Sequence, residues 1–237
     1  FTLSIALLIT SPGTWLAFAL SIALLKAKLL FGSGTPLFAA ISISLLYLAY
    51  NFDFIAADGF HTAEIVSQEG RTKIVRLRMK DVSGMDRYDA LTGVSCASEG
   101  CFLDTGTRHY VRFVDDLDQY DIVSEGREIR YDATELQPVG ANVNFVEPSD
   151  GIIKVRTYEK GVEDETFACG TGIVASAISA HMSGIKPSSC RGDLLVYDVE
   201  ARRDRLRVDF RPGESGHLVA EDVYLTGPAA YVAEIIF

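Results

Sequence analysis

The sequence predicts an α+β fold in which strands surround one buried helix. Residues 170–182 are small and apolar on every side, and a helix without a polar face belongs in the interior of a fold. The segments before and after this helix alternate apolar with polar residues and are separated by turn-forming residues, which is typical of strands with one buried face. With 237 residues, the chain is long enough for one large domain or two small ones.

Residues 1–50 form a zone unlike the rest of the chain. Their charged side chains are Lys26 and Lys28, without one acid, and the uncharged run on each side of these lysines is long enough to cross a bilayer. Turn-forming residues at 11–13 and 32–36 interrupt both runs. Two interpretations stay open: a membrane hairpin, or an artefact such as a wrong reading frame or a mis-joined gene, which the composition favours.

Residues 51–101 and 102–237 both have the composition of ordinary folded protein. In the first of these zones, residues 73–79 alternate apolar with charged side chains and predict a half-buried strand. In the second zone, residues 124–126 and 212–213 predict turns. Its predicted strands cover residues 110–114, 151–158, 194–199, 206–210 and 219–225.

The charge balance excludes one class of partner. The formal net charge is −10, and because residues 1–50 contribute only two lysines, the remainder of the chain is more acidic still. An acidic body does not neutralise phosphates, so nucleic acid is not an expected partner. The composition suits a soluble enzyme of small molecules, which we expect in the cytoplasm.

The chain has four cysteines, Cys96, Cys101, Cys169 and Cys190. None belongs to a Cys-x-x-Cys pair, and no histidine lies at metal-ligand spacing from them. The sequence therefore predicts neither a disulfide framework nor a metal site. Free thiols in a reducing cytoplasm are the expected state.

Cys169 stands where a loop meets the start of the predicted buried helix. Helix N-termini present unpaired N–H groups and a positive partial charge, which predict a lowered pKa for this thiol. Gly170 and Gly172 allow a ligand to approach the backbone, and the N–H groups of Gly170 and Thr171 could hold a carboxylate. A base and an anion site would then lie together, as an amino-acid substrate requires at Cα. The competing interpretation is a buried structural thiol beside glycines that merely begin a helix.

Three sequence blocks follow one another in the last zone: residues 106–115, 140–146 and 155–172. In that order they resemble the Gly-Asn-Pro-His strand, the substrate-binding Asn block and the signature around the second catalytic cysteine of the diaminopimelate epimerase family, which belongs to the cofactor-independent amino-acid epimerases and racemases. The ending at residues 226–229 is also similar. The resemblance covers about residues 102–237, with a looser match back to about residue 55.

The resemblance implies an enzyme that works without a cofactor or a metal. One cysteine thiolate takes the α proton of the substrate, and a second cysteine thiol returns a proton to the opposite face. Cys169 would be one of the two, Glu159 would tune it, and His109 would tune the other. The residues implied around the substrate are Thr107, Asn142, Glu159, Lys160, Gly170 and Thr171.

The same resemblance implies an architecture and a reaction. Two pseudo-symmetric halves, each a curved mixed or antiparallel sheet around a buried central helix, would enclose the site in the cleft between them. Residues 102–237 correspond to the second half, and residues 51–101 to a remnant of the first, which looks incomplete. The implied reaction interconverts LL- and meso-diaminopimelate in lysine biosynthesis. The expected partner is this small molecule, a homodimer is left open, and a membrane is expected only if residues 1–50 are genuine.

The chain departs from the family pattern at several positions. Lys160 stands at the usual Arg and offers a point charge in place of a two-pronged guanidinium. Thr107 stands at the usual Asn, and Arg108 at the usual Pro, where it could partly compensate as a cation. The family's first catalytic cysteine lies in a Cys-Gly-Asn-Gly helix start, which this sequence lacks. Since one thiol cannot serve both faces of Cα, the chain as written is not expected to epimerise efficiently.

Two alternatives remain open. The first is a related cofactor-independent isomerase of the proline racemase or phenazine type, which the long signature at residues 155–172 disfavours. The second is a non-catalytic or membrane-tethered protein that still binds diaminopimelate, which the absent first cysteine favours.

Overall fold

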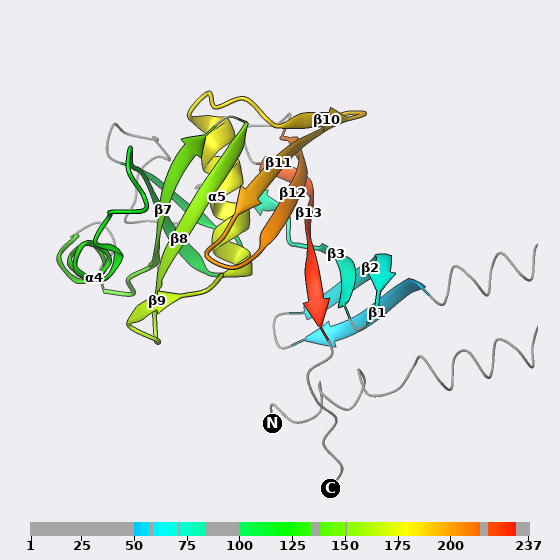
Figure 1. The fold of residues 1–237 in the computed structure, drawn as a ribbon, viewed down its shortest axis with the longest axis horizontal. Coiled ribbons are helices and arrows are strands. Elements are labelled where there is room, and N and C mark those ends of the chain that lie inside the picture. Colours follow the sequence, from blue (N-terminus) through cyan, green and yellow to red (C-terminus); the bar gives the residue numbers. More distant parts are fainter. Residues whose placement is uncertain are drawn as a thin grey trace, which may run out of the picture. The chain divides into compact units, whose positions relative to one another are not determined.

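The computed structural model describes residues 50–56, 59–70, 72–83, 100–133, 138–149, 151–213 and 218–230. The hydrophobic segment predicted at the N-terminus lies outside the described residues except for Tyr50. The chain divides into two compact units, Phe1–Val75 with Ala229–Phe237 and Arg76–Pro228, and each is considered by itself (Figure 1). The domain boundaries after residues 50 and 101 stay predictions.

The first unit contains an antiparallel hairpin. β1 (Asn51–Ala56) pairs with β2 (Gly59–Glu69). Phe54 lies directly opposite His61 with their ring centroids 5.4 Å apart, a cross-strand aromatic contact that stabilises such pairs. β3 (Thr72–Arg78) follows and confirms the strand predicted at residues 73–79.

The second unit is built on one mixed sheet, whose main strands are β5 (Cys101–Asp104), β6 (Arg108–Phe113), β7 (Asn142–Ser149), β8 (Ile152–Glu159), β11 (Leu194–Glu200), β12 (Arg205–Pro212) and β13 (Leu218–Ala230). Their spatial order is β13-β12-β11-β8-β7-β6-β5. β6 runs parallel to β7 and β8 parallel to β11, while the other neighbours are antiparallel. All strands predicted in this zone are confirmed.

Three short strands extend the sheet of the second unit. β4 (Val82–Ser83) pairs with β13, β9 (Asp164–Thr166) with β8, and β10 (Ser189–Arg191) with β11. β9 brings the chain back along β8 just before the start of the next helix. This return places the segment that carries Cys169 beside the end of β8.

The helix α5 (Gly170–Met182) is the centre of the second unit. Every residue from Gly172 to Ala180 is buried, which confirms the prediction drawn from its uniformly apolar composition. α5 contacts β5, β6, β7, β8, β11 and β12, and Figure 1 shows it lying against the sheet. The fold class is therefore α+β, with a mixed sheet packed on a buried helix.

The helix α4 (Ile122–Asp132) was not predicted, and the turn predicted at residues 124–126 is wrong because these residues lie inside it. Asp121 caps the helix by accepting a hydrogen bond from the Ser124 N–H at 3.1 Å. Gly126, whose presence suggested a turn, is buried against β8, where a Cβ would lie 2.5 Å from Cβ of Tyr158. Close packing on β8, rather than turn geometry, explains this glycine.

Within the described part of the chain, neither α4 nor α5 is both long and apolar enough to cross a membrane.

Candidate active site

The candidate site forms where β6, β7 and β8 meet the first turn of α5. His109 on β6 lies opposite Asn142 on β7 in the parallel register. The Lys160 N–H, just after β8, donates to Asn142 Oδ1 at 2.8 Å. The Thr105 hydroxyl, just before β6, donates to the carbonyl of Thr171 at 2.9 Å. Segments far apart in the sequence are thus joined at one end of the sheet.

Cys169 is the N-cap residue of α5. Its backbone is extended, with φ −116° and ψ 110°, and its side chain makes no capping hydrogen bond to the described helix. The sulfur lies 3.5 Å from Thr171 Oγ1, and the N–H groups of Thr171 and Gly172 favour its ionised form by lowering its pKa. Gly172 permits this arrangement because a Cβ there would lie 2.4 Å from Asn144 Oδ1 and 3.3 Å from Cβ of Cys169.

Burial is the first influence on the Cys169 thiol. It raises the pKa above its ordinary value, and the Glu159 carboxylate adds to this, while the Thr171 hydroxyl and the N–H groups of Gly172 and Thr171 act in the opposite direction. The prediction of a lowered pKa is therefore wrong. The helix N-terminus is present as predicted, but desolvation and a neighbouring negative charge outweigh it. Without substrate, Cys169 rests as a protonated thiol at neutral pH.

His109 is fully buried and hydrogen bonded through both ring nitrogens. Its Nε2 lies 2.9 Å from Thr107 Oγ1 and 2.9 Å from Thr171 Oγ1, and its Nδ1 lies 3.1 Å from Asn144 Nδ2. Burial lowers the pKa of His109 to about 4, against an opposing influence of Asp104. The imidazole is consequently neutral near pH 7.

Asn142 connects the ends of three strands. Its Nδ2 donates to the carbonyl of Arg108 at 3.2 Å and approaches Thr107 Oγ1 at 3.4 Å, while its Oδ1 accepts from Lys160 N–H. Glu159, at the end of β8, is half-buried and acts on Cys169 through its charge. These bonds support a rigid rim beside the thiol.

Comparison with known proteins identifies the family. A family model described as diaminopimelate epimerase matches residues 101–230. A diaminopimelate epimerase of Flavobacterium psychrophilum is 34% identical over 204 residues, which are 86% of this chain and 71% of that protein. The chain belongs to the diaminopimelate epimerase family. The members of this family that it matches are named as epimerases, which are isomerases.

Other relatives are matched over less of their length. A diaminopimelate epimerase of Chlorobaculum tepidum is 36% identical over 184 residues, 77% of this chain but 63% of that protein. One of Aquifex aeolicus is 51% identical over 106 residues, which are 38% of its length. The chain thus spans less than two thirds of several family members that it matches.

Solved structures with low sequence identity share the fold. A probable proline racemase from Agrobacterium radiobacter, with bound carbonate, gives a TM-score of 0.54 at 16% identity, covering 78% of this chain and 60% of its own. A hydroxyproline epimerase from Agrobacterium vitis, with bound trans-4-hydroxy-L-proline, gives 0.53 at 18% identity, covering 76% and 57%. These likenesses support the α+β fold of this chain.

The structure gathers most of the predicted site residues of this chain. Hydrogen bonds connect Cys169, Thr171, His109, Thr107 and Asn142 into one network. Gly170 begins α5, and Lys160 joins through its backbone while its side chain is exposed. The catalytic and substrate-binding roles of these residues stay predictions.

Two members of the network were missed by the sequence analysis. Asn144 is fully buried and contacts His109, and Thr105 anchors the first turn of α5. Asn142 and Asn144 are two positions apart on one strand, so their side chains share a face. Two amides that alternate with apolar residues at the start of β7 were the available signal for Asn144, whereas nothing local distinguishes Thr105.

The cysteines differ from the prediction in one respect. Cys169 and Cys190 are free, but Cys101 is disulfide-bonded, so the prediction of free thiols is wrong for Cys101. Sequence spacing alone does not show which thiols approach each other in the fold. In the described part of the chain, no cluster of three His, Cys, Asp or Glu residues is arranged to hold a metal ion.

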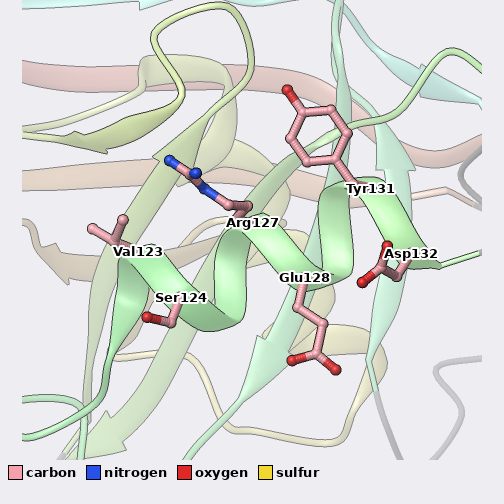
Figure 2. Close-up of a pocket in the computed structure, with 6 residues that line it drawn as sticks. All are labelled: Val123, Ser124, Arg127, Glu128, Tyr131 and Asp132. Carbon is pink, nitrogen blue, oxygen red and sulfur yellow. The ribbon is translucent and has the colours of Figure 1, made fainter.

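A hollow of about 580 Å³ along α4 contains none of the predicted site residues. Figure 2 shows the side chains that line it, which all project from this one helix: Val123, Ser124, Arg127, Glu128, Tyr131 and Asp132. They recur at helical spacing, as expected for the solvent face of a surface helix. The hollow is therefore part of the exposed surface of α4, and the start of α5 stays the candidate site.

Proposed function

We propose that this chain catalyses proton transfer at Cα of diaminopimelate, with Cys169 as the group that exchanges the α proton. The observation that carries this proposal is a thiol at the N-terminus of the buried helix α5, reached by backbone and hydroxyl donors. Such donors stabilise the thiolate that must form when Cys169 gives up its proton. Family membership supports the choice of substrate.

The resting thiol limits how Cys169 can act first. Because burial and Glu159 favour the protonated form, the resting group can give a proton only to an α carbanion that another group has formed on the opposite face, so exchange by this chain alone must begin with the thiolate. The resulting thiolate is then stabilised by the N–H groups of Thr171 and Gly172. In the opposite direction of the reaction, this thiolate takes the α proton.

The remaining site residues are proposed to bind the substrate. The N–H of Gly170 lies in the first turn of α5, where an α-carboxylate is stabilised by the helix N-terminus. Lys160 is exposed beside the rim formed by Asn142, so its ammonium group is available to a distal carboxylate. A point charge there would bind less specifically than the guanidinium usual in the family.

Inversion at Cα needs a second proton-transfer group on the opposite face. Cys169 is followed by Gly-Thr-Gly, whereas Cys96, Cys101 and Cys190 lack glycines at the corresponding positions. We therefore expect the 237-residue chain alone to exchange the α proton of one stereocentre with retention, and to invert it slowly.

Deuterium incorporation tests this function. The chain is incubated with LL- or meso-diaminopimelate in D₂O, and mass spectrometry measures label at Cα while chiral chromatography measures inversion. Label in one isomer without inversion is expected, and Cys169→Ala should abolish it. The matched control is Cys190→Ala, which removes an exposed thiol and should leave the incorporation unchanged. Label that persists in Cys169→Ala would refute the assignment.

The second candidate function is binding without catalysis. It is favoured by the absence of a second Cys-Gly-x-Gly segment in the sequence. Calorimetric binding of diaminopimelate without any deuterium incorporation would establish it. We place either activity in the cytoplasm; a homodimer and a membrane attachment are further expectations, which sedimentation and vesicle flotation of the full chain would test.

A further inference from the structure

The hydroxyl of Thr171 occupies a bridging position that the family resemblance did not assign. It lies 2.9 Å from Nε2 of His109 and 3.5 Å from Sγ of Cys169. The Thr107 hydroxyl lies beside this bridge, 3.2 Å from Thr171 Oγ1. A fully buried imidazole and the candidate catalytic thiol are therefore connected through one hydroxyl group.

The orientation of Asn144 fixes the direction of the hydrogen bonds. Its Nδ2 lies 3.3 Å from the carbonyl of Tyr110, and a carbonyl only accepts, while its Oδ1 accepts from the Thr157 hydroxyl at 2.9 Å. The same Nδ2 therefore donates to Nδ1 of His109. In the neutral imidazole the proton must then lie on Nε2.

The Nε2–H group of His109 donates toward the threonine hydroxyls. If it donates to Thr171 directly, the proton of the Thr171 hydroxyl can point at Sγ. If it donates to Thr107, that hydroxyl can donate to Thr171, and the last proton again points at Sγ. Both routes end with a hydroxyl donor on the sulfur, which favours the thiolate over the thiol.

We propose that Thr171 is a positioning residue that couples His109 to Cys169 and stabilises the Cys169 thiolate. No proton of the substrate passes through it. The resemblance links His109 to the other catalytic cysteine, whereas the contacts in this chain link it to Cys169. The consequence for catalysis rests on the proposed function, but the coupling itself is a property of the thiol.

The protonation state of His109 keeps the direction of these hydrogen bonds the same as the pH changes. Burial keeps the pKa of His109 near 4, with Asp104 as the opposing charge. The imidazole thus remains neutral, with Nδ1 as acceptor, throughout the pH range in which the Cys169 thiol titrates.

The pH dependence of alkylation tests the coupling without any substrate. In the full chain carrying C190S, iodoacetamide modification of Cys169 is followed by mass spectrometry from pH 6 to 11. T171V, which removes the hydroxyl at nearly constant volume, should raise the apparent pKa of Cys169 by about one pH unit, since hydrogen bonds to charged groups are worth somewhat more than neutral ones. T171S should restore the parent profile. An unchanged profile in T171V would overturn the proposal.

A double-mutant cycle tests whether His109 acts through Thr171. H109F removes both ring nitrogens and should raise the apparent pKa of Cys169, but should add nothing in a T171V background. Additive shifts would show that His109 acts by another route and would overturn the coupling. If circular dichroism shows that H109F does not fold, H109L, which also removes both ring nitrogens, takes its place in the cycle. H109Q is the control, because its amide N–H can stand in for Nε2–H and should leave the profile near that of the parent.

Two measurements separate this inference from the proposed function. A shifted alkylation profile in T171V, together with no deuterium incorporation by the parent chain, would support the coupling and refute the catalytic role. Deuterium incorporation with an unshifted profile would do the reverse.

Discussion

The N-termini of the two helices α4 and α5 differ in how they are capped. α4 begins on the surface, and the Asp121 side chain caps it by accepting the Ser124 N–H. α5 begins at Cys169, whose side chain makes no capping hydrogen bond to the described helix, and the N–H groups there favour the ionised form of its thiol. The capping hydrogen bond at α4 stabilises that helix, whereas the N–H groups at the start of α5 act on the thiol of Cys169.

The glycines of the two helices extend this comparison. Gly126 in α4 and Gly172 in α5 both face β strands at distances that exclude a Cβ. Gly126 packs on the apolar part of Tyr158, while Gly172 packs on the amide of Asn144, which belongs to the network of His109. The lack of room for a Cβ therefore allows close packing of α4 on β8, whereas in α5 it allows the helix to approach the network of the candidate site.

Alanine at these two glycines should give the largest effects on stability. The added Cβ would lie 2.5 Å from Cβ of Tyr158 in Gly126→Ala and 2.4 Å from Asn144 Oδ1 in Gly172→Ala. Each should lower the free energy of unfolding by about 3 kcal/mol, because both neighbours are buried and overpacking is relieved only by shifts of the backbone. Urea denaturation measures this loss.

The two alanine variants should differ in the reactivity of Cys169. Gly172→Ala displaces Asn144 and the start of α5, so the alkylation profile should change, whereas Gly126→Ala should retain the parent profile. Equal effects of both variants on the thiol would remove the distinction between the helices.

The pH dependence of stability should reveal the buried His109. Its pKa falls from the ordinary 6.5 to about 4 on folding, so the unfolded chain binds more protons between these pH values. The free energy of unfolding is therefore undiminished above pH 6.5 and falls as the pH decreases, by about 2 kcal/mol at pH 5. Urea midpoints at pH 7.5 and 5 measure the difference.

His109→Gln is the matched control for this pH dependence. It removes the titrating ring but retains His181, whose pKa burial also lowers. Between pH 7.5 and 5, the free energy of unfolding of this variant should fall by less than that of the parent. The difference between the two should be most of the roughly 2 kcal/mol that linkage assigns to His109. A control with the same drop as the parent would show that other groups cause it.

Loss of the α4 cap should have the smallest effect. Asp121→Ala removes the acceptor of the Ser124 N–H and should lower the free energy of unfolding by less than either glycine variant, because the cap is exposed to solvent. Deuterium incorporation into diaminopimelate should be unchanged, because α4 contributes no residue to the network around Cys169. Asp121→Asn, which keeps a capping oxygen, should recover most of the stability.

Periodic sequence patterns predicted the sheet and α5. A strand with one buried face alternates apolar and polar residues, and a helix buried on all sides is apolar throughout, so both patterns can be recognised in the sequence. α4 was missed since Ser124 and Gly126 have turn composition, and only contact with Tyr158 explains the glycine. The elevated pKa of Cys169 escaped prediction for a similar reason. It depends on burial and on Glu159, which reach the thiol through the fold and not through adjacent sequence.

The candidate site was predicted residue by residue from the resemblance, but its connections were not. Thr171 was assigned to the substrate, and its bridge between His109 and Cys169 follows from distances across strands. Asn144 determines the tautomer of His109 through a bond that no local motif encodes. Motifs therefore predicted which residues take part in the candidate site, and tertiary packing determined which of them contact one another.

The most direct test of the account is deuterium incorporation at Cα of diaminopimelate by three proteins measured side by side: the parent chain, Cys169→Ala and Asp121→Ala. The account predicts incorporation by the parent and by Asp121→Ala at equal rates, and a loss of about 10²–10⁴-fold in Cys169→Ala, the range expected when a positioned proton-transfer group is removed. Incorporation by Cys169→Ala at the parent rate would contradict the central claim that the start of α5 carries the proton-transfer group.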